Sequence, residues 1–225
     1  MPSPPIIDSH IHLWPQSAAN PAGHDWMEVK PQLARQMGID DYLTASSGAD
    51  VLGFIYIDTA RTLGTGKEMT DWAAQQFEEI KYLRRIAEGN PIEGEGHTEE
   101  HAKLLRGFVP WAPINRGVAV FEEYLAEAER VAGPLAWGKI KGFRYLLQQI
   151  TNRDEFTDLA LNDETVEVLR LFKAKGRNFV FDVGVDQRSG GIWQLEAAAA
   201  MIQRVHDGVN ENDKVTFVLS KCHVI

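Results

Sequence analysis

Near its amino end the chain reads Ile6-Ile7-Asp8-Ser9-His10-Ile11-His12-Leu13-Trp14. The apolar lead-in and the alternation that follows predict a β-strand, on which Asp8, His10 and His12 share one face. Two imidazoles two residues apart on a strand can both turn a ring nitrogen toward one divalent ion, whereas a helix would splay them apart. The stretch therefore predicts a metal site with His10 and His12 as ligands. The alternative is a set of ordinary polar residues on a half-exposed strand.

The composition is that of an ordinary globular protein, with 225 residues, 44% hydrophobic and 24% charged. We expect one domain over residues 1–225. The net charge of -9 disfavours nucleic acid or an anionic membrane surface as a partner, because phosphates would be repelled. A single cysteine, Cys222, cannot form an internal disulfide, and no stretch of 18 apolar residues occurs. These features predict a cytoplasmic protein without a nucleic-acid or membrane partner.

Segments with strand character alternate with segments of helical character along the chain. The predicted strands cover residues 6–13, 51–58, 105–114, 140–146, 179–185 and 215–219. One short helix is predicted after Gly38 and another after His97. Four further helices are predicted over residues 68–88, 118–131, 162–176 and 192–205. A loop is predicted around Asn152 and Asp154. Such alternation is typical of a parallel sheet covered by helices, either doubly wound or closed into a barrel.

A barrel of the (β/α)8 type is favoured over a doubly wound sheet. No Gly-x-Gly-x-x-Gly opens a helix after a strand, and candidate polar residues stand at or just after the carboxyl ends of strands, where barrels build their sites. These residues are Asp8, His10, His12, Asp58, Trp111, Arg144 and Asp182. An eight-stranded barrel at this spacing needs roughly 300 residues or more. The sequence therefore predicts an incomplete TIM-barrel-like α/β fold with about six strands.

Several motifs together resemble a known family. They are Ile7-Asp-Ser-His-Ile-His12, Tyr82-Leu-Arg-Arg-Ile-Ala-Glu-Gly89, Lys141-Gly-Phe-Arg144 with Leu147-Gln148, and Phe181-Asp182. The chain resembles the amidohydrolase-related group of the amidohydrolase superfamily from about residue 5 to residue 219, and within it the sugar-acid lactonases.

The resemblance implies a distorted (β/α)8 barrel that hydrolyses a sugar-acid lactone. His10 and His12 would hold a divalent ion, Zn²⁺, which would polarise the lactone carbonyl; some lactonases of this group use loosely held metal or none. Arg144 would stabilise the developing oxyanion or bind a polar substrate group, and its alternative role is an ion pair with a neighbouring acid. Asp182 is placed either in the catalytic site or in a structural pair. The substrate-binding candidates are Trp14, Trp111 and Gln148.

The carboxyl end departs from the family pattern. Lys221 stands where the family's sixth-strand histidine is expected, and His223 is the nearest substitute. Strands seven and eight, with their aspartate, are absent. Two further interpretations therefore stay open: a non-catalytic, truncated remnant, or a related amidohydrolase or decarboxylase with another carbonyl substrate. Open barrel edges would also favour self-association.

A competing motif lies at His97-Thr98-Glu99-Glu100-His101, which matches the inverted zinc-protease pattern His-x-x-Glu-His. The motif begins in a glycine-rich loop and has no long helix around it. We expect a solvated helix start there; a metalloprotease site and a role lining the predicted site are the alternatives.

Overall fold

The computed structural model describes residues 4–186 and 190–222, of which residues 220–222 are described by their backbone alone. Its contacts divide the chain into two compact units, described separately here. The first unit comprises the residues up to 110 together with 127–140, and the second comprises 111–126 and the residues from 141 onward. Whether they form a single domain, as the sequence predicts, stays a prediction. No helix in the described ranges is long and apolar enough to cross a membrane.

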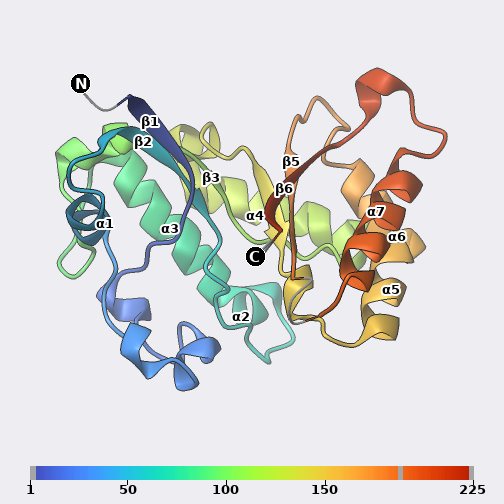
Figure 1. Ribbon diagram of the computed structural model, residues 1–225, viewed down its shortest axis with the longest axis horizontal. Coiled ribbons are helices and arrows are strands. Elements are labelled where there is room, and N and C mark those ends of the chain that lie inside the picture. The colour runs from blue at the N-terminus through green and yellow to red at the C-terminus, as the bar shows by residue number, and fades with distance from the viewer. Residues whose placement is uncertain (1–3, 187–189, 223–225) are drawn as a thin grey trace. The chain divides into compact units, whose positions relative to one another are not determined.

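The first unit is built on a parallel sheet in the order β1-β2-β3 (Figure 1). The strands are β1 (Pro5–Ile11), β2 (Asp50–Ile57) and β3 (Leu105–Val109). The helices are α1 (Ile39–Ala45), α2 (Met69–Trp72) and α3 (Ala74–Glu88). Helix α3 buries Phe77, Ile80, Leu83 and Ile86 along one stripe, and it ends at Gly89, whose φ of 67° gives the left-handed cap that glycine adopts without strain.

The second unit repeats this plan with a parallel sheet in the order β4-β5-β6 (Figure 1). The strands are β4 (Gly142–Tyr145), β5 (Val180–Val185) and β6 (Thr216–Cys222). The helices are α5 (Arg153–Leu161), α6 (Asp163–Arg170) and α7 (Trp193–His206). Helix α4 (Gly117–Trp137) contributes residues to both units and is interrupted at Gly133, before Pro134. In the part of the chain that the structure describes, six strands form two parallel sheets, which confirms the predicted α/β fold with about six strands.

Several predicted boundaries were wrong, and three of the differences have a local reason. The helix expected over residues 68–88 is two helices, because Ala73 leaves helical geometry. The third strand ends at Val109, before Pro110, which has no N–H for the ladder. The loop expected around Asn152 is helix α5, whose first amides donate to the Asn152 side chain. Helix α6 ends at Arg170, well before Gly176.

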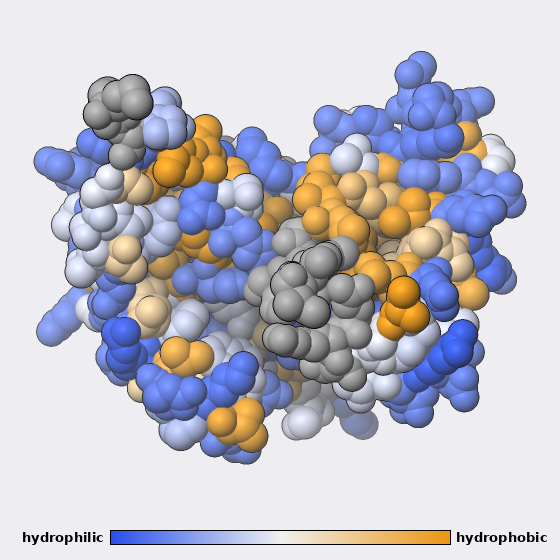
Figure 2. Space-filling view, viewed as in Figure 1, coloured by the Kyte–Doolittle hydropathy of each residue, from blue (hydrophilic) through white to orange (hydrophobic). Residues whose placement is uncertain are grey.

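Each sheet leaves apolar side chains exposed on an outer strand. In the first unit Ile6 and Ile7 of β1 are 40% and 56% exposed, and in the second Val218 and Leu219 of β6 are 41% and 55% exposed. Figure 2 shows apolar surface gathered over the β1 and β2 region and over the β5 and β6 region. Exposed apolar edge strands are the usual sites of strand pairing between chains.

Candidate functional site

His10 of β1 and His12, just after that strand, bring their imidazole rings together. The Nε2 atoms of His10 and His12 lie 3.2 Å apart, and the rings meet edge to face. Two ligands of a tetrahedral zinc ion, each at its usual bond length, stand about 3.3 Å from one another. The observed separation therefore fits two imidazoles on one metal ion.

The other ring nitrogen of His12 fixes which nitrogen can bind a metal. His12 Nδ1 lies 3.0 Å from the carbonyl oxygen of Ile57, at the end of β2. A carbonyl oxygen only accepts, so Nδ1 carries the hydrogen and Nε2 keeps its lone pair. This is the arrangement in which metal-binding histidines are usually held by a neighbouring acceptor.

Asp8 does not join the two imidazoles, contrary to the expectation of three converging groups. Its carboxylate accepts from the backbone amide of His10 and from the Tyr42 hydroxyl. The pairing of β1 with β2 shifts register between Asp8 and Ile11, which interrupts the simple alternation. Among the side chains of residues 4–186 and 190–219, no three His, Cys, Asp or Glu group as metal ligands do. His223, the predicted substitute ligand, lies outside the described residues.

The Trp14 side chain is buried and not exposed to solvent. Its indole Nε1 donates to the Arg35 carbonyl at 2.7 Å, and its ring contacts the rings of His24 and Trp26. Trp14 belongs to an apolar cluster with Ala19 and Met27. Its predicted role in substrate binding stays a prediction.

In the second unit, Arg144 and Asp182 occupy paired positions on the neighbouring strands β4 and β5. Arg144 Nε lies 3.4 Å from Asp182 Oδ1, and both side chains are almost completely buried. The ion pair that the sequence left open as an alternative is therefore present. Whether the pair also acts on a substrate stays a prediction.

Gly184 makes room for the Arg144 guanidinium. A Cβ at position 184 would stand 2.8 Å from Arg144 Nη2 and 3.1 Å from Gln148 Oε1. Trp111 forms a bridge to Arg144, and its ring contacts Tyr145. Asp182 and Gly184 thus lie beside the buried Arg144 guanidinium, and Trp111 pairs with Arg144 through the backbone.

The His97–His101 segment does not place its two histidines on one face of an α-helix, as the inverted zinc-protease motif requires. His97 precedes the 3₁₀ helix Glu99–Leu104, which contains His101, so the two imidazoles do not share an α-helical face. The expected solvated start is wrong for His97, which is buried with Nε2 3.2 Å from Glu95 Oε2. Burial raises the pKa of Glu95, but its hydrogen bonds from His97 and Arg85 outweigh this, so the pKa lies below its usual value. These contacts hold the loop against α3.

Sequence reasoning missed a buried polar cluster at the carboxyl end of β2. Glu79 of α3 is fully buried, and its Oε1 accepts from the Tyr56 hydroxyl at 2.6 Å and from the Thr59 hydroxyl at 2.6 Å. Arg61 Nε lies 3.7 Å from the same oxygen. The signal was available, because Glu79 falls on the apolar stripe of the predicted helix, between Phe77 and Ile80.

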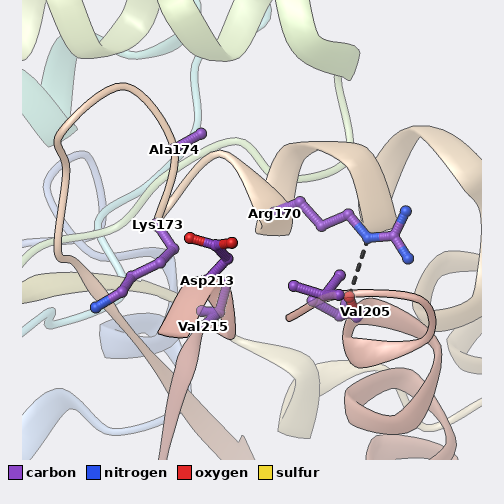
Figure 3. Close-up of a pocket in the computed structure, with 7 residues that line it drawn as sticks. Arg170, Lys173, Ala174, Val205, Asp213 and Val215 are labelled. Carbon is purple, nitrogen blue, oxygen red and sulfur yellow. Dashed lines mark hydrogen bonds between the residues drawn. The ribbon is translucent and has the colours of Figure 1, made fainter. Parts of the chain in front are cut away.

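One cavity of about 330 Å³ lies in the second unit near the start of β6. Figure 3 shows the Arg170 side chain directed to the Val205 carbonyl and away from Lys173 and Asp213. Arg170 also donates to the carbonyls of Arg204 and Asp207. Arg170 therefore caps the end of α7, and the polar groups of this cavity do not converge on a ligand.

Comparison with known proteins shows what this chain resembles. No protein-family model matches the chain. An L-rhamnono-γ-lactonase from Scheffersomyces stipitis is 30% identical over 204 residues, which are 89% of this chain and 57% of that protein.

Two crystal structures of an amidohydrolase from Burkholderia multivorans share the fold. The one with bound zinc matches with a TM-score of 0.59 at 21% identity over 88% of this chain and 54% of its own. The one with bound HEPES matches with a TM-score of 0.57 at 20% identity. The chain spans about half the length of these relatives. The chain is thus similar in sequence to this lactonase, and it shares its fold with the solved amidohydrolase structures.

Proposed function

We propose that this chain carries part of the active site of a metal-dependent hydrolase that opens sugar-acid lactones. The observation that carries the proposal is the pair of His10 and His12 Nε2 atoms, 3.2 Å apart at the end of β1. The L-rhamnono-γ-lactonase from Scheffersomyces stipitis supports the substrate class, and the zinc in the Burkholderia amidohydrolase supports the metal.

His10 and His12 would hold the ion. The hydrogen bond from His12 Nδ1 to the Ile57 carbonyl oxygen would fix the orientation of the His12 ring. When bound, Zn²⁺ supplies a Lewis acid and lowers the pKa of its bound water. In lactone opening, a water oxygen adds to the carbonyl carbon, the ring C–O bond breaks, and the ring oxygen takes a proton to give a hydroxy acid. In the second unit, the Arg144 guanidinium held by Asp182 has the charge to stabilise an anionic oxygen, and we assign it as the candidate for that role.

The second candidate function is metal binding by a chain that does not catalyse hydrolysis on its own. The observation in its favour is that no third metal ligand joins His10 and His12 within the described ranges. The same chain would then need groups from the part of the family fold that it does not span.

A chimera distinguishes these two functions. We expect the 225-residue chain to hydrolyse L-rhamnono-γ-lactone little or not at all. We expect activity when the carboxyl-terminal part of the Scheffersomyces lactonase is joined after β6, and its loss on His12→Ala in the chimera. Titration of the released acid measures both. Full activity of the chimera with His12→Ala would contradict the proposal.

We also propose that the chain self-associates through its exposed edge strands. Ile7→Lys on β1 is expected to reduce association, because a charge on an edge strand opposes pairing between chains. Val29→Lys is the matched control, since Val29 is 79% exposed but lies outside the strands. Light scattering during gel filtration measures the mass. A monomeric wild-type chain, or an equal effect of both variants, would refute this proposal.

A further inference from the structure

The carbonyl group of Ile57, at the end of β2, is the acceptor that orients the His12 ring. β1 ends at Ile11, which pairs with Tyr56 of β2. Beyond that pair the His12 side chain reaches across to β2, with Nδ1 3.0 Å from the Ile57 carbonyl oxygen. The direction of this carbonyl therefore decides where the His12 ring points.

The peptide group that contains this carbonyl is held from its other side by β3. A peptide group is planar and trans, so the Ile57 carbonyl and the Asp58 amide point in opposite directions. The Asp58 amide donates to the Val109 carbonyl at 2.9 Å. A rotation of this peptide would disturb both contacts, so the orientation of His12 depends on how the chain is held on each side of it.

Glu79 of α3 holds the residues on both sides of that peptide. Its Oε1 accepts from the Tyr56 hydroxyl at 2.6 Å, from the Thr59 hydroxyl at 2.6 Å and from the Thr59 amide at 3.1 Å. Tyr56 precedes Ile57, and Thr59 follows Asp58. One buried carboxylate oxygen therefore brackets the peptide whose carbonyl contacts His12.

The groups around this carboxylate are suited to hold it. Burial, and then the charge of Glu79, raise the pKa of Tyr56 well above its usual value, so the hydroxyl keeps the hydrogen that it donates. Arg61 Nε lies 3.7 Å from Glu79 Oε1, and both side chains are buried. Hydrogen bonds to a carboxylate in such an interior are stronger than neutral ones at the surface.

The turn after Thr59 shows that the chain is held there against its local preference. Ala60 has a φ of 59°, in the left-handed region that alanine rarely adopts. Its amide donates to Asp58 Oδ1 at 3.0 Å. A backbone of this kind persists only where the surrounding contacts over-determine it, and the two contacts of Thr59 with Glu79 are among them.

We propose that Glu79 is a positioning residue of the metal site: through Tyr56 and Thr59 it fixes the Ile57 carbonyl, and through that carbonyl it fixes the His12 ring. This inference rests on the metal site proposed above. Outer hydrogen-bond partners of metal-binding histidines change metal affinity by about 10–100-fold when they are lost. Glu79 extends this influence from the end of β2 to a helix that does not carry a ligand.

Nitrogen NMR of the metal-free chain tests the positioning role without zinc. At about pH 8 an ordinary histidine is neutral, and the shifts of its two ring nitrogens show which one carries the hydrogen. In the wild type we expect His12 to carry it on Nδ1, with the signal assigned by its absence in His12→Ala. Thr59→Val keeps the shape of the side chain but removes the hydroxyl. It should lower the ratio of Nδ1–H to Nε2–H rings roughly tenfold, the equivalent of one hydrogen bond.

Two further variants define the cause of that change. Glu79→Gln keeps the size of the side chain but weakens the acceptor, so it should shift the His12 tautomer in the same direction as Thr59→Val. Thr59→Ser keeps the hydroxyl and should behave as the wild type. If Glu79→Gln does not fold, the Thr59 variants decide the question.

Glu95→Gln is the matched control. Glu95 is also buried in the first unit and accepts hydrogen bonds from Arg85 and His97, which hold a different loop against α3. Its loss should lower the stability of the chain but leave the His12 tautomer as in the wild type. An unchanged tautomer in folded Thr59→Val, or an equal change in Glu95→Gln, would overturn the proposal.

Calorimetric titration with Zn²⁺ gives the second readout. We expect Thr59→Val and Glu79→Gln to bind zinc about tenfold more weakly than the wild type, and Glu95→Gln to bind it equally well. Wild-type zinc affinity in Thr59→Val would overturn the proposal. A wild-type chain that takes up no zinc would instead contradict the metal site itself, and the His12 tautomer would still decide the role of Glu79.

Discussion

Replacing Asp182 with alanine is expected to lower the free energy of unfolding by about 3–5 kcal/mol, because it leaves the buried Arg144 guanidinium without its carboxylate. The two side chains are only 1% and 3% exposed, so water cannot replace the lost partner without rearrangement of β4 and β5. The neighbouring Gly184 lets the guanidinium lie close to the strand, which leaves it little freedom to move away. Denaturant unfolding measures the difference.

Asp163→Ala is the matched control for this measurement. Asp163 also pairs with an arginine, Arg204, but the two side chains are 85% and 44% exposed. We expect its loss to cost no more than about 1 kcal/mol, as for other solvent-exposed pairs. Equal costs for Asp182→Ala and Asp163→Ala would contradict the view that burial makes the Arg144 pair essential.

A second large loss of stability is expected from Glu79→Ala. The substitution removes the acceptor of the Tyr56 and Thr59 hydroxyls and the anion beside Arg61, all in the interior of the first unit. We expect a cost of about 3–5 kcal/mol, since buried donors and a buried cation lose their partner together.

The adjacent residue provides the control. Glu78 is exposed and pairs with Lys81 on the same helix, so Glu78→Ala should cost less than about 1 kcal/mol. Thermal and denaturant unfolding of both variants, measured side by side, give the difference. A Glu79→Ala protein as stable as Glu78→Ala would show that the buried cluster does not stabilise α3 against β2.

The strands were predictable because their signals are local. The apolar run at β2 and the alternation at β1 follow directly from the side-chain period of a strand. Helix α5 was not predictable in the same way, since only Phe156 and Ala160 are buried along its nine residues. Its signal was the Asn152 cap, and a cap residue before a weak apolar stripe reads equally well as a loop.

The site was predictable in its residue types and less so in its partners. The spacing of His10 and His12 predicts converging imidazoles, and the structure has them. The same spacing predicts Asp8 beside them, but a register shift and the Tyr42 hydroxyl determine its position instead. Thr59 contacts His24 and Glu79, which lie 35 and 20 positions away along the chain, so no local sequence pattern predicts these contacts.

Zinc uptake by the purified chain tests the metal site most directly. Calorimetric titration of the wild type with Zn²⁺ should show binding at one site, and His10→Ala with His12→Ala should abolish it, because both imidazoles face the same point. His97→Ala with His101→Ala is the control and should leave uptake unchanged, since His97 pairs with Glu95 and His101 with Thr98. Zinc binding that survives in the first variant, or disappears in the second, would contradict the assignment of the metal to His10 and His12.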